Sequence, residues 1–195
     1  MIDTKQKILD AAEHLFAENG YSATSLRQII SEAGVNLAAV HYHFGSKEEL
    51  LDAVVLRKAA PVNKQRVALL DGYEAAADGK ALPVATILDA FLTPMAQKAS
   101  GNPQFVRVMG RIVAEGLIHT VIAKNFHSVL ARFTAALRTS LPGLSEEEFG
   151  WRVVFMQGAM AHTMCGTPGS DFERRIQLLA RFLSGGFEAP PAEGK

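Results

Sequence analysis

Few residues of this 195-residue chain have the types and spacing that catalysis or metal binding requires. His41 and His43 lie two positions apart in a segment with helical spacing, so their side chains diverge and cannot share a metal ion. Glu115 and His119 have the i, i+4 spacing of a ligand pair, which is more often a hydrogen-bonded pair. The sequence contains no glycine-rich phosphate-binding motif, and no candidate base accompanies Cys165. We therefore expect neither an enzyme nor a bound metal or cofactor.

The composition excludes several further classes of protein. The chain is 48% hydrophobic and 21% charged, unlike disordered or collagen-like sequences, and it is long enough for one substantial core. Twenty basic residues balance 20 acidic ones, so binding to nucleic acid would depend on local charge. One cysteine permits no internal disulfide and is typical of a reducing compartment. Charges near the N-terminus argue against a signal peptide, and no apolar run reaches the roughly 18 residues of a membrane span. We expect a cytoplasmic protein.

Apolar residues recur with helical spacing along the whole chain, and alternating strand patterns are scarce. Three compact helices occupy the first fifty residues, and capping-box patterns begin at Ser25 and Ser46. We expect Pro61 to kink or end the fourth helix. Longer helices fill the remainder. The sequence therefore predicts an all-α fold of about nine helices, with a disordered tail over residues 188–195.

The segment from Thr24 to Phe44 has the spacing of a helix–turn–helix motif, with Gly34 in the turn. An ordinary helical hairpin has the same spacing, so the exposed face of the second helix has to decide between them. Ala38 and Tyr42 point away from the side that faces the first helix. Small side chains let a helix enter the major groove, and a tyrosine can donate to phosphate. This face predicts DNA binding, because a merely solvated helix more often exposes Lys and Glu.

The motif is part of a longer pattern that comprises Ile8-Leu9-Asp10-Ala11-Ala12, Leu15-Phe16, Gly20-Tyr21, Thr24, Ile29, Ala33-Gly34-Val35, Tyr42-His43-Phe44 and Ser46-Lys47-Glu48-Glu49-Leu50-Leu51. Over about residues 5–52 this pattern resembles the TetR family of bacterial transcriptional regulators. The resemblance implies a helix–turn–helix domain at residues 1–47 and an effector-binding and dimerisation domain at residues 48–187. It also implies a homodimeric repressor that binds a palindromic operator and is released by a small hydrophobic effector. A helical protein-interaction module without DNA binding is the alternative.

Carried over by position, the resemblance also implies a set of DNA-contacting residues. Lys47 would bind phosphate beside the amides of a helix N-terminus. Leu37 and His41 stand where family members commonly carry Lys and Tyr. Leu37 therefore removes a phosphate contact and either packs inward or contacts a thymine methyl group, while His41 makes its contact weaker and sensitive to pH. The expected set is Thr24, Ser25, Arg27, Asn36, Leu37, Ala38, Ala39, His41, Tyr42, His43 and Lys47.

The local charge of this region is slightly negative. Residues 1–58 contain six Lys and Arg residues and eight Asp and Glu residues. We therefore expect weak non-specific affinity and a shallow salt dependence, so that operator binding relies on geometry and dimerisation.

The remainder of the chain is rich in phenylalanine and methionine, since nine of 11 Phe and five of six Met follow residue 58. These residues suit a pocket for a flexible hydrophobic ligand, although any single one of them is more often part of the core. Arg107, Arg111 and His119 are candidates for binding a carboxylate or phosphate head, and a surface salt bridge is the alternative for Arg111. The predicted ligand-binding residues are Phe91, Met95, Phe105, Met109, Arg111, Val113, Phe126 and Met156.

A second resemblance narrows the chemical class of the expected effector. Residues 36–40 and 42–47, followed by Arg57, Ala60-Pro61, Asn63 and Arg66, resemble a TetR subgroup that includes fatty-acid-responsive repressors. It implies a fatty acid or an acyl-thioester as effector.

The last two helices are the expected dimer interface, which would place two recognition helices about 34–36 Å apart. An intramolecular hairpin is the alternative. The residues expected at the interface are Gly158, Ala159, Ala161, His162, Phe172, Ile176, Leu179 and Leu183.

Overall fold

The computed structural model of the protein describes residues 3–101, 103–117, 120, 124–164 and 171–192. These residues form an all-α fold without a strand, which confirms the predicted fold class. Within these ranges, no helix combines the length and the apolar character of a membrane span. The nine helices they contain are α1 (Thr4–Asn19), α2 (Leu26–Ala33), α3 (Leu37–Phe44), α4 (Lys47–Ala76), α5 (Val84–Gly101), α6 (Pro103–Ala114), α8 (His127–Ser140), α9 (Glu146–Met164) and α10 (Phe172–Glu188).

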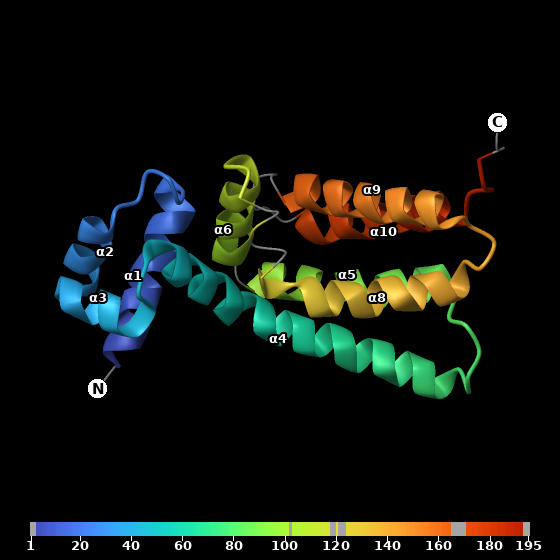
Figure 1. The fold of residues 1–195 in the computed structure, drawn as a ribbon, viewed down its shortest axis with the longest axis horizontal. Helices are drawn as coiled ribbons and strands as arrows, with labels where there is room; N and C mark the ends of the chain where they lie inside the picture. The colour runs from blue at the N-terminus through green and yellow to red at the C-terminus, as the bar shows by residue number, and fades with distance from the viewer. Residues whose placement is uncertain (1–2, 102, 118–119, 121–123, 165–170, 193–195) are drawn as a thin grey trace.

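The helices are arranged in two parts that α4 connects. Figure 1 shows α1, α2 and α3 gathered at one end, the longer helices at the other end, and α6 between the two groups. Helix α5 packs against α4, α8 and α10, and α6 packs against both α1 and α9. We call residues 3–46 the head and residues 47–192 the body.

The short helices of the head have well-defined ends. The Ser25 side chain accepts from the backbone N–H of Gln28, and the Ser25 backbone N–H donates to the Gln28 side chain. Ser46 and Glu49 form the same two hydrogen bonds, so both predicted capping boxes are confirmed. Gly34 ends α2 in the left-handed conformation, with φ of 64°, which a residue without a Cβ adopts readily. The backbone groups at these helix ends are therefore satisfied locally, and the motif folds as its sequence predicts.

Helix α4 runs through Pro61 without interruption for 30 residues. The expectation that this proline could end the helix is therefore wrong. A proline inside a helix costs about 3 kcal/mol. Ala59, Val62 and Leu70 are buried on the same helix, which packs against α5 and α8, and this packing offsets the cost.

Helix α10 belongs to the core of the body. It packs against α5 and α9, and its apolar stripe is buried within the chain. The expectation that this stripe forms the dimer interface is therefore wrong, because these side chains are already covered in a single copy of the chain. The buried stripe consists of Phe172, Ile176, Leu179 and Leu183.

The segment that follows α10 is held against α9. Arg152 donates to the carbonyl oxygens of Phe187, Ala189 and Pro190 at 2.6, 2.9 and 3.1 Å, and the backbone N–H of Ala192 donates to Glu148 at 3.2 Å. The half-buried Arg152 and Glu148 thus bind the backbone of Ala189, Pro190 and Ala192, within the 188–195 segment that the sequence predicts to be disordered. Residues 193–195 lie outside the described residues.

Candidate DNA-binding surface and ligand cavity

The outer face of α3 is exposed and weakly polar. Val40 and Phe44 are buried against the rest of the head, whereas Ala38 is exposed and the Tyr42 side chain is 85% exposed. Leu37, for which the sequence left two orientations open, is half exposed. The helix therefore presents the small side chain of Ala38, the half-buried Ala39 and the exposed Tyr42 ring, and small side chains allow a helix to enter a duplex groove.

Three residues of the predicted DNA-binding set have structural roles in the head. Thr24 is 2% exposed and its hydroxyl donates to the carbonyl oxygen of Gly20 at 2.7 Å, so its side chain does not reach the surface. Ser25 caps α2, and the Asn36 side-chain oxygen accepts from the Ala39 N–H at 2.9 Å at the start of α3. The prediction that the Thr24 side chain contacts DNA is corrected: it closes the turn that positions α2.

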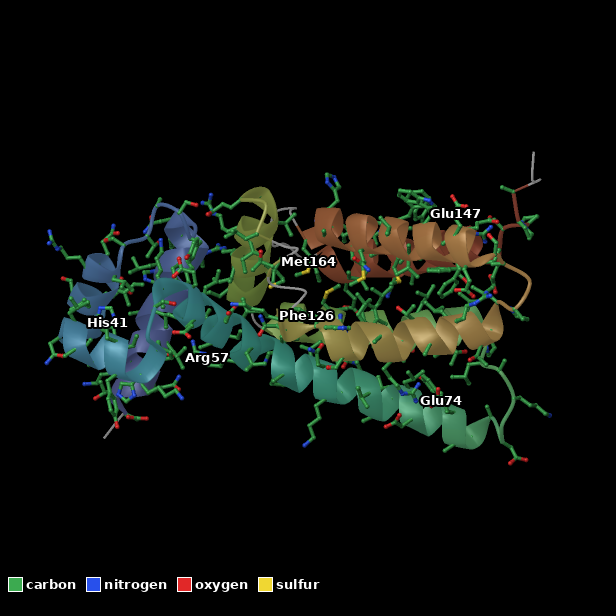
Figure 2. All side chains as sticks on the ribbon, in the orientation of Figure 1. His41, Arg57, Glu74, Phe126, Glu147 and Met164 are labelled. Carbon is green, nitrogen blue, oxygen red and sulfur yellow. The ribbon has the colours of Figure 1, made fainter. Side chains whose placement is uncertain are left out.

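The two histidines of α3 lie beside Tyr42. The Nδ1 atom of His41 is 2.8 Å from the carbonyl oxygen of Gly45, and because a carbonyl only accepts, Nδ1 carries the proton. The Nε2 atom of His41 is then the one left for an external partner. The His43 ring packs edge-on against the Tyr42 ring at a centroid distance of 5.1 Å, which orients the tyrosine. Figure 2 shows His41 on α3, at the end of the molecule far from α9 and α10.

Basic side chains near α3 are few, and several are bound to other groups of the protein. Arg57 bonds to Asp10 at 2.6 Å and pairs with Glu13, and Lys58 pairs with Glu13 at 2.8 Å, which fastens α4 to α1. The Lys47 ammonium lies 4.1 Å from the centre of the Tyr21 ring, and its partial burial lowers its pKa. Arg27 and Lys5 are exposed on the head. Little positive charge is therefore available for phosphate.

The loop between α1 and α2 is hydrogen-bonded to the residue that follows α6. One carboxylate, Glu115, accepts hydrogen bonds from the backbone N–H groups of Tyr21 and Ser22 at 2.8 Å each and from the Ser22 hydroxyl at 2.6 Å. Burial opposes the charge of Glu115, but these hydrogen bonds and the nearby Arg111 lower its pKa overall. Gly20 has a φ of 86°, and a Cβ at this position would clash with a carboxylate oxygen of Glu115. Sequence reasoning considered Glu115 only as half of a pair with His119.

Two arginines of α6 also bind the head. Arg107 pairs with the Glu18 side chain at 3.2 Å, and Arg111 donates to the Glu18 backbone oxygen at 2.9 Å. Neither lines the cavity described below, and both bind Glu18 of α1, which favours the surface contact over a role in binding a ligand head. His119, the third candidate, lies outside the described residues. We call the contacts of Glu115, Arg107 and Arg111 with the head the α6 clasp.

The body encloses an apolar cavity of about 80 Å³ between α4, α5, α6, α8 and α9. Five predicted ligand-binding residues line it, whereas Met156 is buried outside it and the Phe105 side chain lies beyond the described part of the chain. Figure 2 shows Phe126 and Met164 beside α6, at the end of the body nearest the head. The lining comprises Ala59, Val62, Arg66, Phe91, Met95, Met109, Val113, Phe126, Val129, Leu130, Gln157, Met160, Ala161 and Met164.

Arg66 is the charged residue of this lining, and it is buried, with 3% of its surface exposed. Its Nε donates to the Phe91 carbonyl oxygen at 2.7 Å and one terminal nitrogen donates to Asn63 Oδ1 at 3.1 Å. Burial lowers its pKa to about 9. The sequence contained a signal for this site, because Arg66 lies four positions from both Val62 and Leu70 on a buried helix face.

The outer faces of α9 and α10 expose large apolar side chains. Trp151 and Phe155 stack at a centroid distance of 6.0 Å on α9. Phe155 is 64% exposed and Phe182 of α10 is 70% exposed. Of the expected interface residues on α9, Gly158 and His162 are exposed, while Ala159 and Ala161 are half buried. We call this surface the α9–α10 patch; it consists of Trp151, Val154, Phe155, Leu178 and Phe182.

Two family models match the chain, and together they cover both parts of the molecule. The model of bacterial regulatory proteins of the tetR family matches residues 8–54, and the model of the tetracyclin repressor-like C-terminal domain matches residues 85–186. The first range spans the helix–turn–helix motif, and the second contains most of the cavity lining and the α9–α10 patch.

Similar proteins include two curated regulators. The chain is 42% identical over 60 residues to the HTH-type transcriptional regulator SrpR of Pseudomonas putida, across 31% of this chain and 28% of SrpR. It is 36% identical over 73 residues to the HTH-type nicotine-responsive transcriptional repressor HdnoR of Paenarthrobacter nicotinovorans, across 37% of this chain and 38% of HdnoR. The chain thus matches less than two fifths of either relative.

Solved structures share the fold over nearly the whole chain. The fatty acid degradation regulator FadR from Bacillus halodurans superposes with a TM-score of 0.72 at 15% identity, covering 97% of this chain and 99% of FadR. SmeT, the repressor of the Stenotrophomonas maltophilia multidrug efflux pump SmeDEF, superposes with a TM-score of 0.66 at 24% identity, covering 93% and 89%.

Proposed function

Because this chain belongs to the tetR family of bacterial transcriptional regulators, we propose that it is a homodimeric repressor released from a palindromic operator by a small hydrophobic effector. The observation that carries the proposal is the exposed face of α3, where Ala38 and Tyr42 stand clear of the head. On this proposal the alanines approach base edges, Leu37 contacts a thymine methyl group, and the Tyr42 hydroxyl donates to phosphate.

The α9–α10 patch supports dimerisation. Exposed tryptophan and phenylalanine side chains grouped on two adjacent helices are typical of a protein interface. Two copies related by a twofold axis would bury the patch against itself, since the same surface then serves both subunits. This pairing would join two heads in one molecule, as a palindromic operator requires.

Helix α6 supplies a route from the effector to the operator. Met109 and Val113 line the cavity. Arg111, on the same helix, and Glu115, directly after its end, bind the head. A ligand that displaces the cavity-lining side chains therefore acts on the element that fixes the head. Helix α4 takes part as well, because it lines the cavity and is fastened to α1 through Arg57. The apolar lining and the subgroup resemblance favour a fatty acid or an acyl-thioester as effector.

A gel shift with DNA upstream of the protein's own gene tests this function, with Ala38→Glu as the diagnostic variant. A glutamate on the face of α3 places bulk and negative charge against the DNA, so we expect binding at least about 100-fold weaker, with unchanged thermal unfolding. Ala85→Glu, at an exposed position of α5, is the matched control and should bind as the wild type does. Absence of any shift at low salt would favour a protein-interaction module.

The salt dependence of the same shift tests how DNA is bound. Because Arg57 and Lys58 are paired within the protein, we expect few phosphate contacts and a shallow salt dependence. Release of about ten counterions per dimer, on a scale of about 0.9 per phosphate, would contradict this expectation.

A further inference from the structure

The cavity contains a cation that no carboxylate of the described residues neutralises. Ion pairs elsewhere in the described chain join Arg57, Arg132 and Arg152 to Asp or Glu, whereas the partners of Arg66 are a backbone carbonyl, an amide oxygen and a thioether. Gln157 is the other lining side chain that carries a polar group. Burying a charge without a counter-charge is costly, and such a residue is expected to serve a specific partner.

The geometry of Arg66 leaves one edge of its guanidinium for that partner. The plane is fixed, because it stacks on the Phe91 ring at 4.1 Å and Nε donates to the Phe91 carbonyl oxygen. One terminal nitrogen, Nη1, is used by Asn63. Within the described part of the chain, the other terminal nitrogen, Nη2, contacts the sulfur of Met95 at 3.9 Å, and a thioether is a weak acceptor. Met95 itself lines the cavity, so this underused edge borders the ligand space.

We propose, as a deepening of the proposed function, that the effector is an amphipathic free carboxylate whose head binds the Nη edge of Arg66. A carboxylate offers two oxygens to the planar fork of an arginine and supplies the missing negative charge. The Met95 thioether moves aside, and the apolar body of the ligand lies along Met109, Val113 and Phe126. An acyl-thioester has no charge at the corresponding atom and is the weaker ligand.

The size of the cavity fits this arrangement. One water molecule needs about 10–15 Å³ of such cavity volume. A cavity of 80 Å³ therefore accommodates a few heavy atoms before any lining side chain moves. A longer chain must displace methionine side chains, which adapt readily. Met109 belongs to α6, so this displacement reaches the α6 clasp.

The test compares ligands that share a chain and differ in the head: decanoate, decan-1-ol and decanoyl-coenzyme A. Calorimetric titration of the full-length protein should give at least about tenfold tighter binding of decanoate than of the alcohol, the scale of one charge-assisted hydrogen bond. Arg66→Met should remove this preference, and Arg66→Lys should retain part of it. Gln157→Leu, a neutral change in the same lining, is the matched control and should keep the preference for the carboxylate.

Folding and function are controlled separately. Arg66→Met replaces a buried charge by an apolar side chain, so its thermal unfolding temperature without ligand should equal or exceed that of the wild type. Its operator binding without ligand is measured alongside, so that a change in ligand binding is separated from a change in DNA binding. Equal binding of decanol and decanoate, tighter binding of the thioester, or no binding of any of the three overturns the inference. If decanoate binds through Arg66 without releasing DNA, the carboxylate site at Arg66 stands, whereas the proposed release of the repressor by such a ligand fails.

Discussion

The head and the body present their polar groups in opposite ways. In the head the Tyr42 side chain is 85% exposed on a surface of alanine, and the polar groups around it are used in helix caps. In the body the Arg66 side chain is 3% exposed, under phenylalanine and methionine. A large rigid partner such as a duplex needs an accessible surface, whereas a small partner is bound best where water is excluded. The two regions are thus built for partners of different size, and α6 contacts both.

The largest effect that tests this division is expected at the α9–α10 patch. Phe155→Glu should convert the dimer to a monomer and weaken operator binding by about 10²–10⁴-fold, because the two heads no longer bind as one linked unit. Light scattering and the gel shift measure the two effects. Leu56→Glu, which places the same charge at an exposed leucine of α4, is the control and should remain dimeric. A dimeric Phe155→Glu variant would show that subunits associate elsewhere.

A smaller effect is expected at the α6 clasp. Glu115→Gln removes the charge that accepts from Tyr21 and Ser22, so at pH 7 it should lower the free energy of unfolding by about 1.5–3 kcal/mol, measured by urea denaturation. The folded state lowers the Glu115 pKa below its usual value of 4.5. The stabilisation is therefore full above pH 4.5 and is lost as the pH falls through the lower, folded pKa.

The difference between Glu115→Gln and the wild type should accordingly shrink in acid. Glu147→Gln is the control, since Glu147 is an exposed carboxylate at the start of α9 (Figure 2), and its effect should stay within about 0.5 kcal/mol. A Glu115→Gln difference that is equal at pH 7 and at pH 4 would show that the clasp acts through packing and not through charge.

The smallest effect is expected on the exposed tyrosine of α3. Tyr42→Phe removes one hydroxyl donor to phosphate, and a loss of about 1 kcal/mol corresponds to operator binding about fivefold weaker. Filter binding at fixed salt measures it, and thermal unfolding should not change. Tyr73→Phe, in the body, should leave operator binding unaltered. An unchanged affinity for Tyr42→Phe would remove this hydroxyl from the interface.

Sequence patterns with short range were sufficient for the head. The capping boxes at Ser25 and Ser46 and the turn at Gly34 depend on neighbours within four residues, and the structure confirms them. Thr24 was misjudged because its partners, Leu15 and Gly20, precede it along the chain and face the interior. Pro61 does not end α4, one of its two predicted effects, because the packing of α4 outweighs a local preference against helix.

The dimer and ligand surfaces were harder to predict. A stripe of apolar residues at helical spacing identifies a buried face without identifying what buries it, so the Phe172–Leu183 stripe was assigned to a partner subunit instead of to α5 and α9. Five lining residues were predicted because large apolar residues line most cavities, yet the arginine among them was sought on α6 and lies on α4.

The amino-acid sequence by itself determined the helical fold, the helix–turn–helix motif and the residues that point outward from α3, because periodicity and capping act over a few positions. Tertiary structure alone decided that Glu115 holds the loop after α1, that Arg66 is enclosed beside Phe91 and Met95, and that Phe155 and Phe182 stay uncovered. These facts depend on which helices pack together, and the free energy of that packing is summed over contacts between residues far apart in the chain.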